Sequence, residues 1–156
     1  MNDPGTLLVI GYGNRLRGDD AVGPLAADAV AAWRLPGVEA VAVPQLTPEL
    51  AAPLAEAWCA VFVDAATDAD EVSCRAVHPS ATPCAMGHAL DPGGLLGLAL
   101  QAFGRAPGAW LVTIPTSAFE IGARLSPAAR AGLDEALDRM RRWLEGASDH
   151  RLDGSP

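Results

Sequence analysis

Three side chains that suit metal binding or acid–base chemistry, Asp20, Asp64 and His88, lie far apart in the sequence. Asp20 closes the glycine-containing stretch VIGYGNRLRGDD, Asp64 follows the apolar run VFV, and His88 comes just before the stretch LDPGG. Two carboxylates and an imidazole suit a divalent metal of borderline softness, and three protein ligands leave coordination positions open. Whether this chemistry is possible depends on whether the fold brings the three residues together.

Each candidate residue also has an ordinary structural interpretation. An aspartate at a strand end is commonly a cap or turn acid, and for Asp64 taken alone this is the more frequent case. We interpret Asp19 as a cap or first-turn acid, which the positive end of a helix dipole stabilises. We expect His78 and His150 not to be ligands, because the first lies near the opposite edge of the predicted sheet and the second in the tail.

Alternating apolar strands and helical patterns predict an α/β fold. We expect strands at 6–11, 38–44, 59–66, 71–79 and 109–115, and helices at 19–33, 48–58, 91–104 and 126–145. Thr47 is the predicted cap of the second helix, and a Ser-Pro pair starts the last one. About five residues join the third and fourth strands, too few for a parallel crossover, so the fourth strand is predicted to be antiparallel.

The predicted architecture is a single-domain three-layer sandwich. It has a mostly parallel, five-stranded twisted sheet with one antiparallel strand and helices on both faces. Residues 1–146 form the domain, and residues 147–156 form a flexible C-terminal tail because they are polar.

This topology predicts that the three candidate residues converge. Asp20 follows the first strand and Asp64 ends the third, so both reach the edge formed by the carboxyl ends of the parallel strands. The antiparallel fourth strand ends at the opposite edge, and the loop over residues 80–90 must therefore return before the helix at Asp91 begins. This return carries His88 to the edge where Asp20 and Asp64 lie.

The sequence lacks the motifs of nucleotide binding, lysine-based chemistry and common hydrolases. A dinucleotide fingerprint needs a third glycine where this chain has Leu16, and two acids at a helix start repel a pyrophosphate. The chain has no lysine, which excludes Schiff-base chemistry and the lysine of a P-loop. It contains neither a G-x-S-x-G nor an H-E-x-x-H pattern, and we interpret Cys84, near His88, as an ordinary small residue.

The charge and the cysteine content indicate which classes of partner and which cell compartment suit the protein. A net charge of −8 argues against nucleic acid and anionic membranes as partners. Three cysteines, Cys59, Cys74 and Cys84, have no C-x-x-C spacing, which argues against a disulfide framework or a zinc knuckle. The first residues have no basic region, and their apolar run is too short for a signal peptide or a membrane span. We therefore expect a cytoplasmic protein, and we expect no organic cofactor.

Over residues 7–145 the sequence resembles the hydrogenase maturation endopeptidases, which process the large subunit of nickel-iron hydrogenases. The most specific matching stretch is GYGNRLRGDDAVG after the first strand. Weaker stretches follow in the expected order, namely QLTPEL, VFVDAA, GHALDPGGLL and EIGARLSP. Two positions depart from the family pattern, because Asp20 stands where some members have glutamate and Ala21 stands where glycine is common.

The resemblance implies the same fold and a metal-binding acid, acid and histidine trio, which by motif position are Asp20, Asp64 and His88. It implies that the partner is a hydrogenase large-subunit precursor and that the precursor carries the nickel. The protein would recognise the nickel-loaded precursor and remove its C-terminal extension, so that only metal-loaded subunit matures.

Several alternatives remain open at this level. The metal could activate the scissile bond or a water molecule, or it could serve recognition only, with Asp20 or Asp64 assisting as a base. A different class of function is a non-proteolytic nickel-sensing module or chaperone for hydrogenase assembly. A third hypothesis is a small hydrolase or nucleotide-binding domain that has the same fold.

Overall fold

The computed structural model describes residues 5–81 and 89–149, which build one five-stranded sheet. Its strands are β1 (Leu7–Tyr12), β2 (Val38–Val43), β3 (Cys59–Ala66), β4 (Ser73–Val77) and β5 (Gly108–Pro115). Their order across the sheet is β2-β1-β3-β5-β4. All neighbours are parallel except β4 and β5, which pair antiparallel. The mostly parallel sheet with one antiparallel strand is confirmed.

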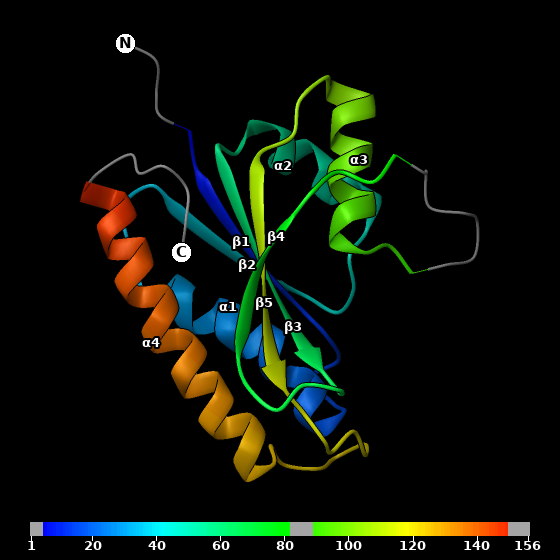
Figure 1. Cartoon of the computed structure of the whole chain (residues 1–156), viewed down its shortest axis with the longest axis vertical. Coiled ribbons are helices and arrows are strands. Elements are labelled where there is room, and N and C mark those ends of the chain that lie inside the picture. Colours follow the sequence, from blue (N-terminus) through cyan, green and yellow to red (C-terminus); the bar gives the residue numbers. More distant parts are fainter. Residues whose placement is uncertain (1–4, 82–88, 150–156) are drawn as a thin grey trace.

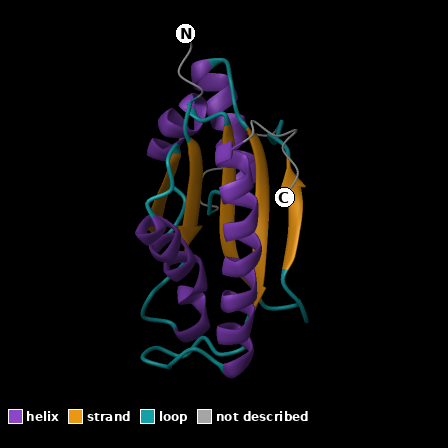
Figure 2. Ribbon diagram, turned by 90° about the vertical axis from the view of Figure 1, so that its left-hand side faces the viewer, coloured by secondary structure: helices purple, strands orange, loops and turns teal. Residues whose placement is uncertain are grey.

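Helices cover both faces of this sheet. They are α1 (Val22–Trp33), α2 (Ala51–Glu56), α3 (Pro92–Phe103) and α4 (Pro127–Asp149), with short 3₁₀ turns η1 (Gly18–Ala21) and η2 (Pro48–Leu50). Figure 1 shows α4 on one side of the strands and α3 on the other. In Figure 2 the long helix α4 runs lengthwise along the strands. No helix in the described residues is both long enough and apolar enough to cross a membrane.

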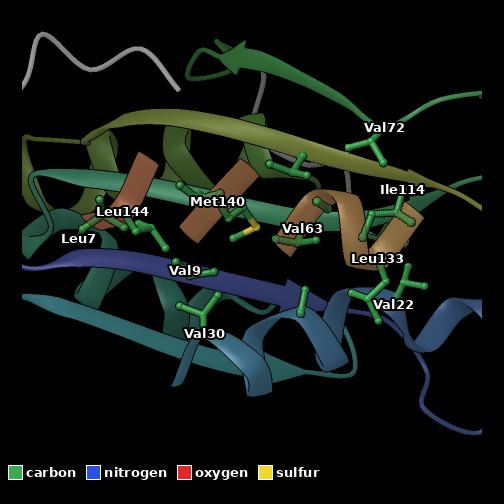
Figure 3. Packing of buried hydrophobic residues seen from close by; sticks show 14 of the residues in the cluster. Leu7, Val9, Val22, Val30, Val63, Val72, Ile114, Leu133, Met140 and Leu144 are labelled. Carbon is green, nitrogen blue, oxygen red and sulfur yellow. The ribbon is translucent and has the colours of Figure 1, made fainter. Parts of the chain in front are cut away.

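Strand β1 is covered on both faces, which explains why its sequence is a continuous apolar run. Leu7 and Val9 belong to the buried cluster beneath α1 and α4, whereas Leu8 and Ile10 belong to the cluster beneath α2 and α3. Successive side chains of a strand point to opposite faces, so a strand covered on both faces is apolar at every position. Figure 3 shows the first cluster, with Val9 among the side chains between the sheet and the two helices.

Two glycines allow the start of α1 to pack directly against β1. A Cβ atom on Gly11 would overlap the carbonyl oxygen of Gly23, and one on Gly23 would overlap the carbonyl oxygen of Tyr12. Backbone therefore meets backbone here, which only glycine permits. This contact holds the turn before α1 close to the end of β1.

The ends of some elements differ from the prediction. Thr47 occupies the predicted cap position before η2, but its side chain makes no cap hydrogen bond there. Helix α4 continues to Asp149, beyond the predicted end at residue 145, because Ala147 is buried against the core. Residues 150–156 of the predicted tail lie outside the described residues. Ser126 does cap α4, since its hydroxyl accepts a hydrogen bond from the Ala129 amide at 3.1 Å.

Candidate functional site

The candidate site lies where the carboxyl ends of β1 and β3 meet. The two strands are parallel neighbours, with Gly11 paired to Val63, so Tyr12 and Asp64 follow at adjacent places in the sheet. The chain after β1 turns back through η1, which contains Asp20. The predicted meeting of the two strand ends at one edge is thus present in the structure.

A tight turn holds Asp20 in place. Its Oδ2 atom accepts a hydrogen bond from the backbone amide of Asn14 at 2.6 Å. Gly13 has a φ of +146°, and a Cβ atom there would overlap the carbonyl oxygen of Asp20. The glycine is therefore needed for the turn to close on Asp20.

Three amides of this glycine-containing turn make hydrogen bonds within the protein. Gly13 donates to the Val43 carbonyl at 3.1 Å, Asp20 donates to the Arg17 carbonyl at 3.0 Å, and the Asn14 amide is bonded to the Asp20 carboxylate. A phosphate cradle needs such amides to point at the ligand. The geometry agrees with the interpretation that this stretch is not a nucleotide site.

Asp64 is half-buried and lies within electrostatic reach of Asp20. Burial raises the pKa of Asp64 above its ordinary value, and the charge of Asp20 raises it further. Hydrogen bonds from the Tyr12 hydroxyl and from the Ala65 amide, the latter at 2.8 Å, act in the opposite direction. No basic side chain is among the described groups that shift the pKa of Asp64. Among the described residues, two carboxylates thus share one edge, and Arg75 is the basic side chain whose charge acts there, on Tyr12 rather than on Asp64.

Tyr12 supports this pair from the end of β1. Burial is the largest cause that raises the pKa of Tyr12 well above its ordinary value, followed by the charge of Asp64 and the hydrogen bond to it. The phenol therefore keeps its proton and donates to Asp64 throughout the physiological range. Sequence reasoning missed Tyr12. The available signal was that the only tyrosine of the chain directly follows the apolar run of β1.

Asp19 has a different role from the predicted one. It does lie in the first turn of η1, but its side chain is fully buried and binds the segment between β5 and α4. The carboxylate accepts hydrogen bonds from the amides of Ser117, Ala118 and Ser126 and from the Ser126 hydroxyl, at 2.7 to 3.0 Å. Burial raises the pKa of Asp19, but the four hydrogen bonds outweigh this effect and keep the pKa below its ordinary value.

The third predicted ligand, His88, lies outside the described residues, as does Cys84. The chain next to this segment does reach the site, because the charge of Asp91 contributes to raising the pKa of Tyr12. Asp91 caps α3 by accepting a hydrogen bond from the Gly94 amide at 2.7 Å. Within residues 5–81 and 89–149, no three histidine, cysteine or acidic side chains gather closely enough to hold a metal.

The two carboxylates of the site, Asp20 and Asp64, suit a cation. Asp20 and Asp64 repel each other when both are charged, and a bound cation relieves that repulsion. Two carboxylates alone are an incomplete set for a metal of borderline softness, for which a nitrogen ligand is typical. Within the described residues no nitrogen ligand joins the two carboxylates in a metal-holding group.

No family model and no curated protein matches the chain. Several solved structures do have a similar fold. The hydrogenase maturating endopeptidase HybD from E. coli matches with a TM-score of 0.70 and 22% identity, over 91% of this chain and 93% of that one. The [NiFe] hydrogenase maturation protease HycI from Thermococcus kodakarensis matches with a TM-score of 0.68 and 19% identity, over 90% and 93%. The hydrogenase 2 maturation peptidase from Thaumarchaeota archaeon matches with a TM-score of 0.63 and 23% identity, over 89% and 97%. The chain therefore has the fold of hydrogenase maturation proteases over nearly its whole length.

Proposed function

We propose that this protein is a hydrogenase maturation endopeptidase, a peptide hydrolase that removes the C-terminal extension of a [NiFe]-hydrogenase large-subunit precursor. The observation that carries the proposal is the Asp20–Asp64 pair, two carboxylates at one sheet edge, with no basic group of residues 5–81 and 89–149 shifting the pKa of Asp64. The shared fold of the matching proteases supports the same conclusion. The negative charge of the pair suits a substrate that presents a cation.

In this proposal the cation is nickel that the precursor already carries, so nickel belongs to the substrate. Asp20, Asp64 and His88 are the residues that contact it. Nickel bound in this way supplies a Lewis acid close to the peptide bond to be cut. Because the extension is cut only when nickel is present, the reaction distinguishes the nickel-loaded precursor from the nickel-free precursor. Such processing belongs in the cytoplasm, where we place the protein.

The chain's own groups serve the attack of water on the scissile carbonyl. Asp64 accepts a proton from the water as the new carbon–oxygen bond forms. The Tyr12 hydroxyl holds the Asp64 carboxylate in place through its hydrogen bond. The carbon–nitrogen bond then breaks, and the proton passes from Asp64 to the leaving amine.

Carboxylate variants test this proposal. The precursor is incubated with wild type, Asp20→Asn, Asp64→Asn or Asp134→Asn, and its intact mass is followed over time. Asp134 is an exposed acid on α4 and serves as the matched control. We expect wild type and the control to release the C-terminal peptide, and both site variants to lose at least about 100-fold in rate.

Cleavage at the wild-type rate by both site variants would contradict the assignment of the pair. If wild type binds the nickel-loaded precursor but never shortens it, the protein is a nickel-sensing chaperone and the protease proposal is wrong. Circular dichroism of each variant establishes that a lost rate is not caused by lost folding.

A further inference from the structure

Two large apolar side chains are almost fully exposed at the edge of the sheet that carries the candidate site. Leu16, in the segment between β1 and η1, is 71% exposed, and Ile121, in the segment between β5 and α4, is 83% exposed. Figure 1 shows these two segments close together at the lower end of the molecule. Single exposed apolar residues are common on protein surfaces, but two that are held together beside a candidate site indicate a binding surface.

Hydrogen bonds join the two segments. The amide of Gly122 donates to the carbonyl of Leu16 at 2.8 Å, and the amide of Asp19 donates to the carbonyl of Ala118 at 2.7 Å. The buried carboxylate of Asp19 adds its four hydrogen bonds to the same segment. Leu16 and Ile121 are therefore presented by a fixed platform, and we call this pair of side chains the apolar ridge.

Asn14 connects the ridge to the candidate site. Its side-chain oxygen accepts a hydrogen bond from the amide of Leu16 at 2.8 Å, while its own amide donates to the carboxylate of Asp20 at 2.6 Å. The residue that carries the ridge and the acid of the site are thus held by the same asparagine. The backbone that carries Leu16 is thus only one shared residue away from the Asp20 carboxylate.

We propose that the apolar ridge, Leu16 with Ile121, binds an apolar side chain of the precursor polypeptide beside the peptide bond that is cut. This inference rests on the proposed function. The carboxylate pair attracts the cation of the substrate, which fixes where the substrate lies, and the ridge is the apolar surface next to that place. Covering an exposed leucine and isoleucine with an apolar side chain removes their surface from water, which favours binding.

The test compares steady-state cleavage of the nickel-loaded precursor by Leu16→Ser, Ile121→Ser and the double variant. Leu100→Ser and Phe103→Ser are the matched controls, because these residues are 47% and 52% exposed and lie in the last turn of α3, the end that leads into the start of β5. We expect KM to rise about fivefold for each ridge variant and more than tenfold for the double variant, with kcat changed less than twofold. The controls keep the wild-type KM.

The outcomes separate this inference from the proposed function. Wild-type KM in the double ridge variant, with cleavage intact, overturns the ridge and leaves the protease assignment standing. An equal rise in KM for the α3 controls also overturns it, because the effect is then general surface apolarity. If wild type itself does not shorten the precursor, the proposed function fails and the ridge fails with it. Thermal melting of each variant identifies any loss that comes from unfolding.

Discussion

At the scale of single residues, the proposed activity depends on three side chains that the fold brings to one edge: Tyr12, Asp20 and Asp64. The two acids are drawn together by the parallel pairing of β1 and β3, and Tyr12 donates a hydrogen bond to one of them. Asp20 is oriented separately, by the Asn14 amide. Each acid thus has its own fixed donor, which preorganises the pair before any substrate arrives.

Replacing Tyr12 by phenylalanine tests the first of these donors. Tyr12→Phe keeps the ring and removes only the hydroxyl that donates to Asp64. We expect the processing rate to fall about tenfold, because one hydrogen bond to a charged group that reacts is worth roughly 1.5 kcal/mol. Initial rates with nickel-loaded precursor measure the effect, and a wild-type rate in this variant would show that the hydroxyl has no part in the reaction.

A pair of histidine variants tests the proposed third ligand. We expect His88→Ala to reduce processing at least about 100-fold, since one nitrogen ligand is lost from the proposed trio. His78→Ala is the control, because His78 is exposed and follows the end of β4 that pairs with the start of β5. Precursor processing by the two variants is compared under the same conditions. Equal activities would remove His88 from the site.

At the scale of elements, the turn η1 and the segment between β5 and α4 act as one unit because Asp19 joins them. The same carboxylate accepts a hydrogen bond from the hydroxyl of Ser126, the residue that caps α4. The start of the last helix is therefore fixed relative to the turn that carries Asp20. The sequence predicted Asp19 as a first-turn acid but not this role, because its partners are about a hundred residues away and only the folded chain brings them near.

Asp19→Asn measures the strength of this connection. The asparagine side chain has one acceptor oxygen instead of two. Its NH₂ group would face the amide and hydroxyl donors of the segment between β5 and α4. We expect the free energy of unfolding to fall by about 3 kcal/mol at pH 7, as is typical for a buried polar group left without partners. Chemical denaturation measures the loss, and Asp134→Asn provides the exposed control. A loss no greater than that of the control would contradict the anchoring role.

The same carboxylate predicts a pH dependence of stability. Because the pKa of Asp19 is lower in the folded protein than in the unfolded chain, its stabilising effect is complete above the unfolded value of about 3.9 and is lost as the pH falls through the folded value. The stability difference between wild type and Asp19→Asn is therefore expected to be constant near neutral pH and to shrink below about pH 4. Denaturation curves at several pH values check this, and a difference that grows in acid would contradict it.

At the scale of the whole molecule, the sheet separates two buried clusters, one beneath α1 and α4 and one beneath α2 and α3. The direction of the strands was predictable, because alternating strands and helices demand parallel pairing and one short connection demands an antiparallel strand. The end of α4 was not predictable in the same way. Gly146 suggests a stop, yet packing of Ala147 against the core continues the helix.

Cys59 provides a probe of the whole fold. It is only 2% exposed at the start of β3, and burial raises the pKa of its thiol to about 11. We expect iodoacetamide to modify Cys59 only when the protein unfolds, because the thiolate is the reactive form and the folded protein withholds it. Peptide mass mapping compares it with the exposed Cys74. Modification of both at the same rate in the native protein would contradict the packing of this strand.

The most direct test of the central claim is the intact mass of the hydrogenase large-subunit precursor after incubation with this protein, with and without nickel in the precursor. We expect only the nickel-loaded form to lose a C-terminal peptide. Loss from both forms would show that the carboxylate pair does not recognise nickel. Loss from neither, with wild-type protein that is folded and binds the precursor, would show that the protein is not the processing protease.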